Sequence, residues 1–176
     1  AMHDLHPVFD RFSRDLRLEE ICRDIGLKEP EIWQSMYIFK QPRIGDQVDW
    51  HQDASYFATR PNTVKAFWFA IDDATQENGC LWVAKKCSQL RQQFIVENGQ
   101  SSMKSLDDEA WPELEDAIPL EVSAGSLIVF DGLLPHFSSP NTSNFSRHAY
   151  TLHVVDGEAE YSRQNWLQKS FRPQID

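Results

Sequence analysis

The chain has 176 residues, of which 41% are hydrophobic and 25% are charged, and it carries a formal net charge of −10. These values are ordinary for a globular protein, and the length fits one domain over residues 1–176 with a sizeable core. The acidic balance argues against a nucleic-acid partner, because phosphate binding needs clustered lysine and arginine side chains. No stretch approaches the roughly 20 apolar residues of a transmembrane helix, so no membrane span is expected.

The three cysteines, Cys22, Cys80 and Cys87, indicate the redox environment. Their number is odd and their spacing is not that of a small secreted domain held by disulfides, so we expect reduced thiols in a cytoplasmic, intracellular protein. The first residues show no signal peptide, which agrees with that expectation. Cys80 and Cys87 flank a predicted strand, but no second cysteine pair accompanies them, so a zinc site is disfavoured.

The first 30 residues are predicted to be helical. Pro7 suits the first position of a helix, where its missing N–H is not needed, and Phe9 and Phe12 lie at helical spacing. Asp15 is expected to cap a second short helix that ends at Gly26. The apolar residues of these helices are assigned to the cover of the core.

From residue 32 onward, aromatic and β-branched residues replace the helical pattern. Strands are predicted at 32–40, 64–71, 80–84, 118–122, 126–130 and 148–155. Turn signals separate them, and many short strands of this kind favour a sandwich or barrel, such as the jelly roll that holds metal sites in the cupins. Two exceptions are expected: a helical insert at 89–97, and an exposed acidic loop at 106–116.

The motif His51-Gln52-Asp53, followed much later by His136, is the strongest chemical signal in the chain. Two histidines and one carboxylate form the facial triad that binds iron(II) and leaves three coordination positions open. On a strand His51 and Asp53 would point to one side and Gln52 to the other. An isolated motif of this kind is often a surface turn or a hydrogen-bonded pair, so its weight comes from the strand-like flanks and from Arg147 downstream.

Several segments resemble the phytanoyl-CoA dioxygenase family, and within it the subgroup of phytanoyl-CoA dioxygenase domain-containing proteins. They are QSMYIFKQP at 34–42, HQDAS at 51–55, DATQENGCLW at 73–82 and SRHAYTLH at 146–153, together with His136. The similarity therefore covers nearly the whole chain.

The resemblance implies a mainly β fold with N-terminal helices, a double-stranded β-helix that binds Fe(2+) and 2-oxoglutarate. His51, Asp53 and His136 match the iron ligands of the family, which are also its catalytic residues. Arg147 matches the arginine that binds the distal carboxylate of 2-oxoglutarate. A planar guanidinium suits that role, because it can donate two parallel charge-assisted hydrogen bonds to a carboxylate.

Other residues are expected to complete the cosubstrate pocket. Met36 and Trp68 match family positions that line it. Gln34 shares a strand face with Met36, and Ser138 carries a hydroxyl that can bind the cosubstrate. His153 is expected to be a structural neighbour of the site and not a fourth ligand.

The implied function is a dioxygenase that uses iron, 2-oxoglutarate and dioxygen (O2) to hydroxylate a small organic substrate, with succinate and CO2 as co-products. Lipid-like and acyl molecules are the candidate substrates. The alternative is a metal-binding or interaction module on the same scaffold that has lost hydroxylase activity.

Two departures from the family concern the scaffold. The chain reads VAKKCS at 83–88, where relatives carry a Pro-Gly-Ser-His turn. Relatives also begin with a further segment of helix and strand, which supplies a cosubstrate-contacting lysine and part of the sheet. Either the chain is a truncated form, or another surface covers the exposed sheet, for which a second copy in a homodimer is the candidate.

Overall fold

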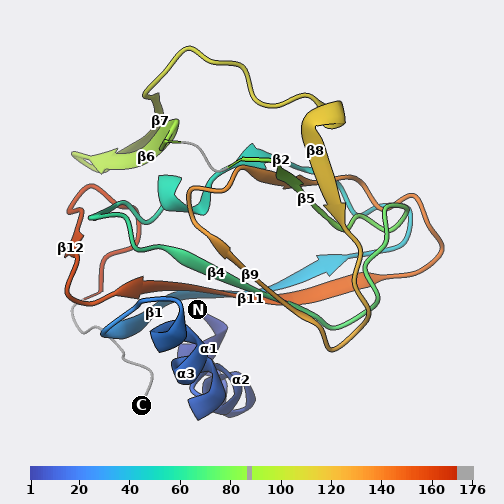
Figure 1. Cartoon of the computed structure of the whole chain (residues 1–176), viewed down its shortest axis with the longest axis horizontal. Helices are drawn as coiled ribbons and strands as arrows, with labels where there is room; N and C mark the ends of the chain where they lie inside the picture. The colour runs from blue at the N-terminus through green and yellow to red at the C-terminus, as the bar shows by residue number, and fades with distance from the viewer. Residues whose placement is uncertain (87–88, 170–176) are drawn as a thin grey trace.

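A computed structural model describes residues 1–86 and 89–169, which form two four-stranded antiparallel sheets packed face to face (Figure 1). The first sheet has the order β1 (Pro30–Lys40), β11 (Arg147–Asp156), β4 (Lys65–Ala70) and β9 (Leu127–Asp131). The second has the order β2 (Val48–His51), β10 (His136–Ser138), β5 (Leu81–Ala84) and β8 (Ala117–Leu120). The predicted mainly β jelly roll is therefore confirmed.

The predicted N-terminal helices are confirmed as α1 (Met2–Leu5), α2 (Pro7–Ser13) and α3 (Leu16–Asp24), which cover the outer face of the first sheet (Figure 1). The Asp15 carboxylate caps α3 by accepting the backbone N–H of Arg17 at 3.0 Å. Gly26 ends the segment with a φ of +95°, a conformation that favours glycine. Leu18 and Cys22 of α3 pack with Phe67 and other residues of the outer sheet face.

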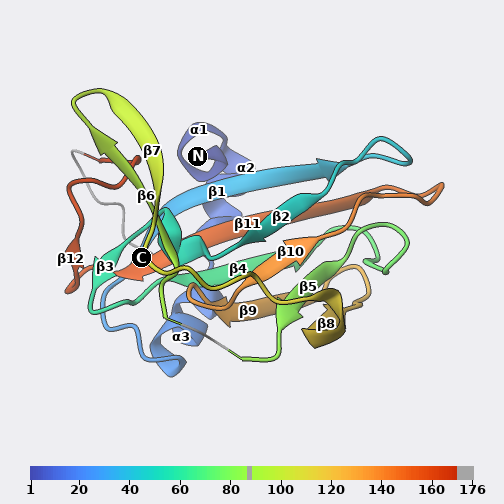
Figure 2. The same ribbon diagram turned by 90° about the horizontal axis from the view of Figure 1, so that it is seen from above.

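The six predicted strands each overlap an observed one, with shifts at their ends. β8 stops at residue 120 instead of 122, and Val122 forms an isolated bridge with Ala74. The short strands β3 (Thr59–Arg60) and β12 (Glu160–Tyr161) pair with each other. They lie at the same end of the sandwich as the hairpin of β6 (Gln92–Glu97) and β7 (Gln100–Ser105), as Figure 2 shows.

The helix predicted at 89–97 is wrong, because β6 pairs antiparallel with β7. Asn98 and Gly99 connect the two strands with φ values of +51° and +76°. Asn-Gly with two positive φ angles is the preferred two-residue hairpin turn, since its twist matches that of the paired strands. The acidic stretch 106–116 is mostly exposed, as predicted, and contains the short 3-10 helix η2 (Leu114–Asp116).

Two buried clusters between the sheets enclose the candidate site. Trp68, Leu81 and Ala149 belong to one cluster, and Phe57 and Val155 belong to the other. Both clusters contribute walls to the cavities described below. None of the described helices has the length and apolar character needed to cross a membrane.

Cys22 and Cys80 are free thiols in buried positions. Burial raises the pKa of Cys22 to about 12 and that of Cys80 to about 11, so both thiols stay protonated at neutral pH. Cys87 lies outside the described residues, and the expectation about it stays a prediction.

Candidate metal centre and cosubstrate pocket

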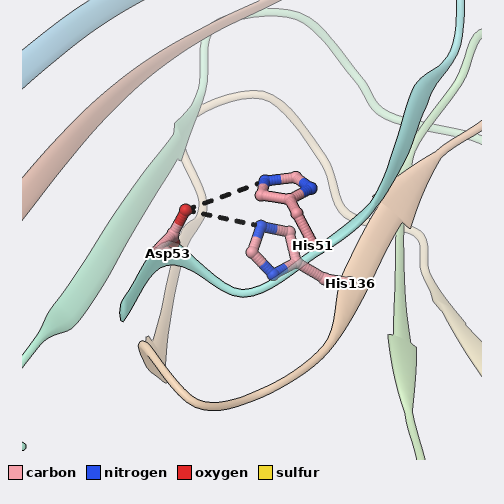
Figure 3. Close-up of side chains that lie close together, drawn as sticks. All are labelled: His51, Asp53 and His136. Atoms are coloured by element: carbon pink, nitrogen blue, oxygen red, sulfur yellow. Dashed lines mark ion pairs between the residues drawn. The ribbon is translucent and has the colours of Figure 1, made fainter. Parts of the chain in front are cut away.

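His51, Asp53 and His136 meet at one point between the sheets (Figure 3). Oδ1 of Asp53 lies 3.7 Å from Nε2 of His51 and 3.8 Å from Nε2 of His136. The two histidines are direct register partners on the neighbouring strands β2 and β10. One ligand atom from each residue lies within 4.8 Å of the others, so the three side chains can share one cation.

The sequence-based reason for the proximity of His51 and Asp53 was wrong, although the two side chains do converge. β2 ends at His51, and Asp53 opens the 3-10 helix η1 (Asp53–Ser55). A turn therefore brings the carboxylate back beside the histidine, in place of the alternation of a continuous strand. Gln52 points elsewhere, and its amide donates to the carbonyl oxygens of Gln89 and Leu133.

Backbone carbonyls orient the rings of both triad histidines and hold a hydrogen on Nδ1 of each. Nδ1 of His51 lies 2.7 Å from the carbonyl oxygen of Asp49, and Nδ1 of His136 lies 3.0 Å from that of Leu134. A carbonyl can only accept, so each Nδ1 carries a hydrogen, and Nε2 is the ring nitrogen left to bind a metal. Both Nε2 atoms face Asp53, which is the orientation that metal-binding histidines adopt.

Burial and neighbouring charges shift the pKa values of Asp53 and His136. Burial alone would raise the pKa of Asp53, but the neighbouring histidines, His153 and His136 foremost, outweigh it and the pKa is lowered. Burial lowers the pKa of His136 to about 4. The group therefore consists of a carboxylate and neutral imidazole, and these ligands suit iron(II).

His153 of β11 contacts the carboxylate of the triad from another side. Its Nε2 lies 3.2 Å from Oδ1 of Asp53, and its ring stacks on Phe57 at a centroid distance of 5.1 Å. The side chain thus lies against a candidate ligand, in line with the expectation that it neighbours the site. Nδ1 of His153 is buried without a hydrogen-bond partner in the described part of the chain.

A cavity of about 280 Å³ extends from the triad to Arg147. The guanidinium is almost fully buried; its Nε donates to the carbonyl oxygen of Gly79 at 3.0 Å, and its centre lies 5.4 Å from the ring of Trp68. Nη1 of Arg147 has no hydrogen-bond partner among the described residues. A buried cationic nitrogen without an acceptor is costly, so this end of the cavity is suited to an anionic group.

The other predicted cosubstrate residues are divided between two cavities. Met36, Trp68 and Ser138 line the cavity that holds Arg147, together with Thr151. Gln34 lines a neighbouring cavity, so the structure does not bring it to Arg147.

Sequence reasoning missed Lys40, a lysine that is only 2% exposed. Its Nζ donates to Oγ of Ser138 at 2.8 Å and also to the Ser139 carbonyl, and Arg147 is its register partner on β11. Burial, followed by the charge of Arg147, lowers the pKa of Lys40 to about 8. A signal was available, since Lys40 follows Met36 by four residues and therefore shares its strand face.

The neighbouring cavity, of about 480 Å³, also reaches His51, Asp53 and Met36. Five aromatic residues line it: Trp50, Tyr56, Phe57, Phe94 and Trp166. Phe57 is buried, and Tyr56 is partly buried. A larger cavity, of about 510 Å³, lies between α2 and the first sheet and contains no triad residue.

Comparison with known proteins agrees with this geometry. The family model for phytanoyl-CoA dioxygenase (PhyH) matches residues 1–149. Phytanoyl-CoA dioxygenase 1 of Oryza sativa subsp. japonica is 41% identical over 99% of the chain, and a phytanoyl-CoA dioxygenase domain-containing protein 1 homolog of Dictyostelium discoideum is 40% identical over 98%. The chain spans 62% and 64% of the length of these two relatives.

Two solved structures share the fold at low sequence identity. The 2-oxoglutarate-dependent carbocyclase SnoK is 15% identical, with a TM-score of 0.74 over 99% of this chain and 74% of its own. EctD from S. alaskensis, solved with 2-oxoglutarate and 5-hydroxyectoine, is 22% identical, with a TM-score of 0.70 over 97% of this chain and 57% of its own.

Proposed function

The chain belongs to the phytanoyl-CoA dioxygenase family, and on that premise we propose that it is an Fe(2+)- and 2-oxoglutarate-dependent dioxygenase that hydroxylates a small organic substrate. The observation that supports this most strongly is a single cavity that is lined both by the triad and by Arg147. A metal site and a buried unpaired cation in one enclosed space suit a small molecule that chelates metal and carries a free carboxylate.

In this proposal His51, Asp53 and His136 hold the iron. Bound there, iron(II) would supply the oxygen activation and the oxidative decarboxylation of 2-oxoglutarate that side chains cannot perform. The protein groups hold the geometry: the carbonyls of Asp49 and Leu134 fix the two rings, and three protein donors leave the remaining positions for cosubstrate and dioxygen.

Arg147 would bind the distal carboxylate of 2-oxoglutarate through its unpaired Nη1. Thr151 has a buried hydroxyl oxygen without a hydrogen-bond partner among the described residues, and it lines the same cavity. It therefore offers a second donor. Trp68 and Met36 supply apolar walls that exclude water from the bound cosubstrate.

Anaerobic titration with iron(II) and 2-oxoglutarate tests the proposal. A dioxygenase should develop a metal-to-ligand charge-transfer absorption band that needs both additions, and then release succinate when dioxygen is admitted. Iron binding without any response to 2-oxoglutarate would instead favour the metal-binding or interaction module.

We also propose that the protein is intracellular and that it forms a homodimer. The free thiols of Cys22 and Cys80 support a reducing, intracellular environment. β1 lies at an edge of the first sheet, and Phe39 on it is 64% exposed, which supports a homodimer that covers this edge.

A further inference from the structure

A second cavity is lined by His51 and Asp53 of the triad but not by Arg147, and it has a distinct chemical character. It shares His51, Asp53 and Met36 with the cosubstrate cavity, but Arg147 and Ser138 line only the cosubstrate cavity. A molecule bound here would therefore lie beside the metal ligands without competing for the carboxylate end of the cosubstrate cavity. We name it the aromatic cavity.

We propose that the aromatic cavity binds the prime substrate, and that this substrate is an uncharged or cationic molecule with an aromatic or hydrocarbon body, not a coenzyme A thioester. The inference rests on the proposed function for the identity of the reaction. The class of molecule that binds is inferred from the residues of the aromatic cavity alone.

The walls of the aromatic cavity come from separate elements that converge beside the triad. Trp50 precedes His51 on β2, Tyr56 follows η1, Phe94 lies on β6, and Trp166 lies in the segment after β12. The rings of Tyr56 and Phe94 are in contact at a centroid distance of 5.7 Å, which places the β6–β7 hairpin beside η1 (Figures 1 and 2).

Several of these aromatic side chains keep surface that is not covered by other parts of the protein. Trp166 is 43% exposed, and Trp50, Tyr56 and Phe94 are only partly buried. Exposed apolar surface that gathers inside a cavity, next to candidate metal ligands, is typical of a ligand site. Flat rings of this kind bind hydrocarbon and aromatic bodies, and they attract cations through their faces.

The charges around the aromatic cavity select against anions. Among the described residues that line it, no lysine or arginine is present, and Asp49 is the carboxylate that is not already assigned to the iron, as Asp53 is. Arg91, at the base of the hairpin, is already bound to Asp107 and to the carbonyl of Ala110. The phosphates of a coenzyme A thioester would meet no cation among the described residues that line the cavity, and they would face a protein of net charge −10.

The cosubstrate cavity has the opposite character, since Arg147 lines it and Lys40 is bound behind Ser138. Neither cation lines the aromatic cavity. A dicarboxylate is drawn to the cosubstrate cavity, and a substrate without negative charge is left for the aromatic cavity. This separation would keep cosubstrate and substrate from exchanging places.

Calorimetric titration of the metal-free protein with matched probes tests the inference. The probes are tryptamine, tryptophol and indoleacetate, and octylamine, octanol and octanoate, so that each body is offered as cation, neutral molecule and anion. We expect the amines and alcohols to bind about tenfold or more tightly than the carboxylates. Carboxylates that bind as tightly as the amines, or no binding by any probe, would overturn the inference.

Variants of the exposed Asp49 sharpen the test. Asp49→Lys should reverse the preference and favour indoleacetate, whereas Asp108→Lys, the same charge change at an exposed acidic residue that does not line the cavity, should leave it unchanged. Trp166→Ala should weaken every probe by about tenfold, because it removes wall area shared by all of them. A Trp166→Ala protein that binds all probes normally would place the site elsewhere.

The two proposals can fail separately. If the charge-transfer band is absent but the probes still bind with the expected order, the dioxygenase proposal falls and the cavity assignment stands. If the band forms and octanoyl-CoA stimulates succinate release more than octanol or octylamine does, the substrate class falls and the dioxygenase proposal stands.

Discussion

Arg147 combines nearly complete burial with a guanidinium nitrogen that has no acceptor in the described part of the chain. We expect Arg147→Ala to raise the Kd for 2-oxoglutarate by about tenfold to a hundredfold, since charge-assisted hydrogen bonds are lost, and to leave iron affinity unchanged. Anaerobic titration at fixed iron measures both quantities. Arg163→Ala, at an exposed arginine, is the control. Equal cosubstrate affinity in the two variants would end the assignment of Arg147.

We expect Lys40 to make the binding of 2-oxoglutarate sensitive to pH. Its pKa is lowered to about 8 by burial and by Arg147, partly offset by Asp46, so the free protein loses this positive charge as the pH rises through about 8. 2-Oxoglutarate is an anion and prefers the charged form, so its affinity should fall between pH 7 and 9. Lys40→Met should bind more weakly at pH 7 and show no such fall. Titrations across this range would contradict the prediction if the wild-type affinity were flat.

His153 offers a way to separate a metal ligand from its neighbour. Because it contacts Asp53 and lies outside the three-residue group, His153→Phe should still bind one iron, with an affinity about tenfold lower. Asp53→Ala should bind none, because it removes the only carboxylate of the group. His148→Phe, on the same strand but paired with Asp72, is the matched control. Metal counting by elemental analysis after gel filtration distinguishes these outcomes.

The sequence singled out His51 and Asp53 because their residue types and short spacing form a local motif, whereas His136, far along the chain, joined the set through the family resemblance. It missed Lys40 and the walls of the aromatic cavity for a different reason. The environment of Lys40 depends on the register of β1 with β11. Trp166 reaches the cavity from a segment far from the motif, and only tertiary packing brings it there.

The positions of the strands were easier to predict from the sequence than the pairing of one strand with another. β-branched and aromatic runs indicated the long strands, since such residues fit a half-buried pleated surface. The hairpin was mistaken for a helix because its apolar run Phe94, Ile95 and Val96 has no clear period, although the turn at Asn98 and Gly99 carried the decisive signal.

Gly79 lies in a turn that contacts Lys40 of β1, Ser139 after β10 and Arg147 of β11. The cost of replacing this glycine can therefore be predicted. A Cβ there would lie 2.5 Å from the Ser139 carbonyl oxygen and 2.6 Å from Cδ of Lys40. Gly125 has nearly the same φ, +86° against +88°, but no heavy atom near such a Cβ. Gly79→Ala should therefore destabilise the protein by about 1–3 kcal/mol more than Gly125→Ala does. Urea unfolding of both variants measures the difference, and equal losses would show that only backbone strain matters.

The arrangement of the sandwich leaves β1 and β9 as the edges of the first sheet. Edge strands present unpaired backbone groups, and β1 also carries Phe39, whose side chain is 64% exposed. Pairing of two β1 strands about a twofold axis would cover both features in one antiparallel contact. The net charge of −10 on each copy opposes such pairing, so we expect dimerisation to strengthen as salt screens the repulsion.

Sedimentation of the 20.4 kDa chain at low and physiological salt tests this dimer. Phe39→Lys should give monomers at both salt concentrations, because a charged side chain on an edge strand opposes pairing. Leu114→Lys adds the same charge at an exposed apolar residue of η2, outside the first sheet, and should sediment like the wild type. A wild-type chain that stays monomeric at physiological salt, or equal dissociation by both variants, would mean that β1 is not the contact surface.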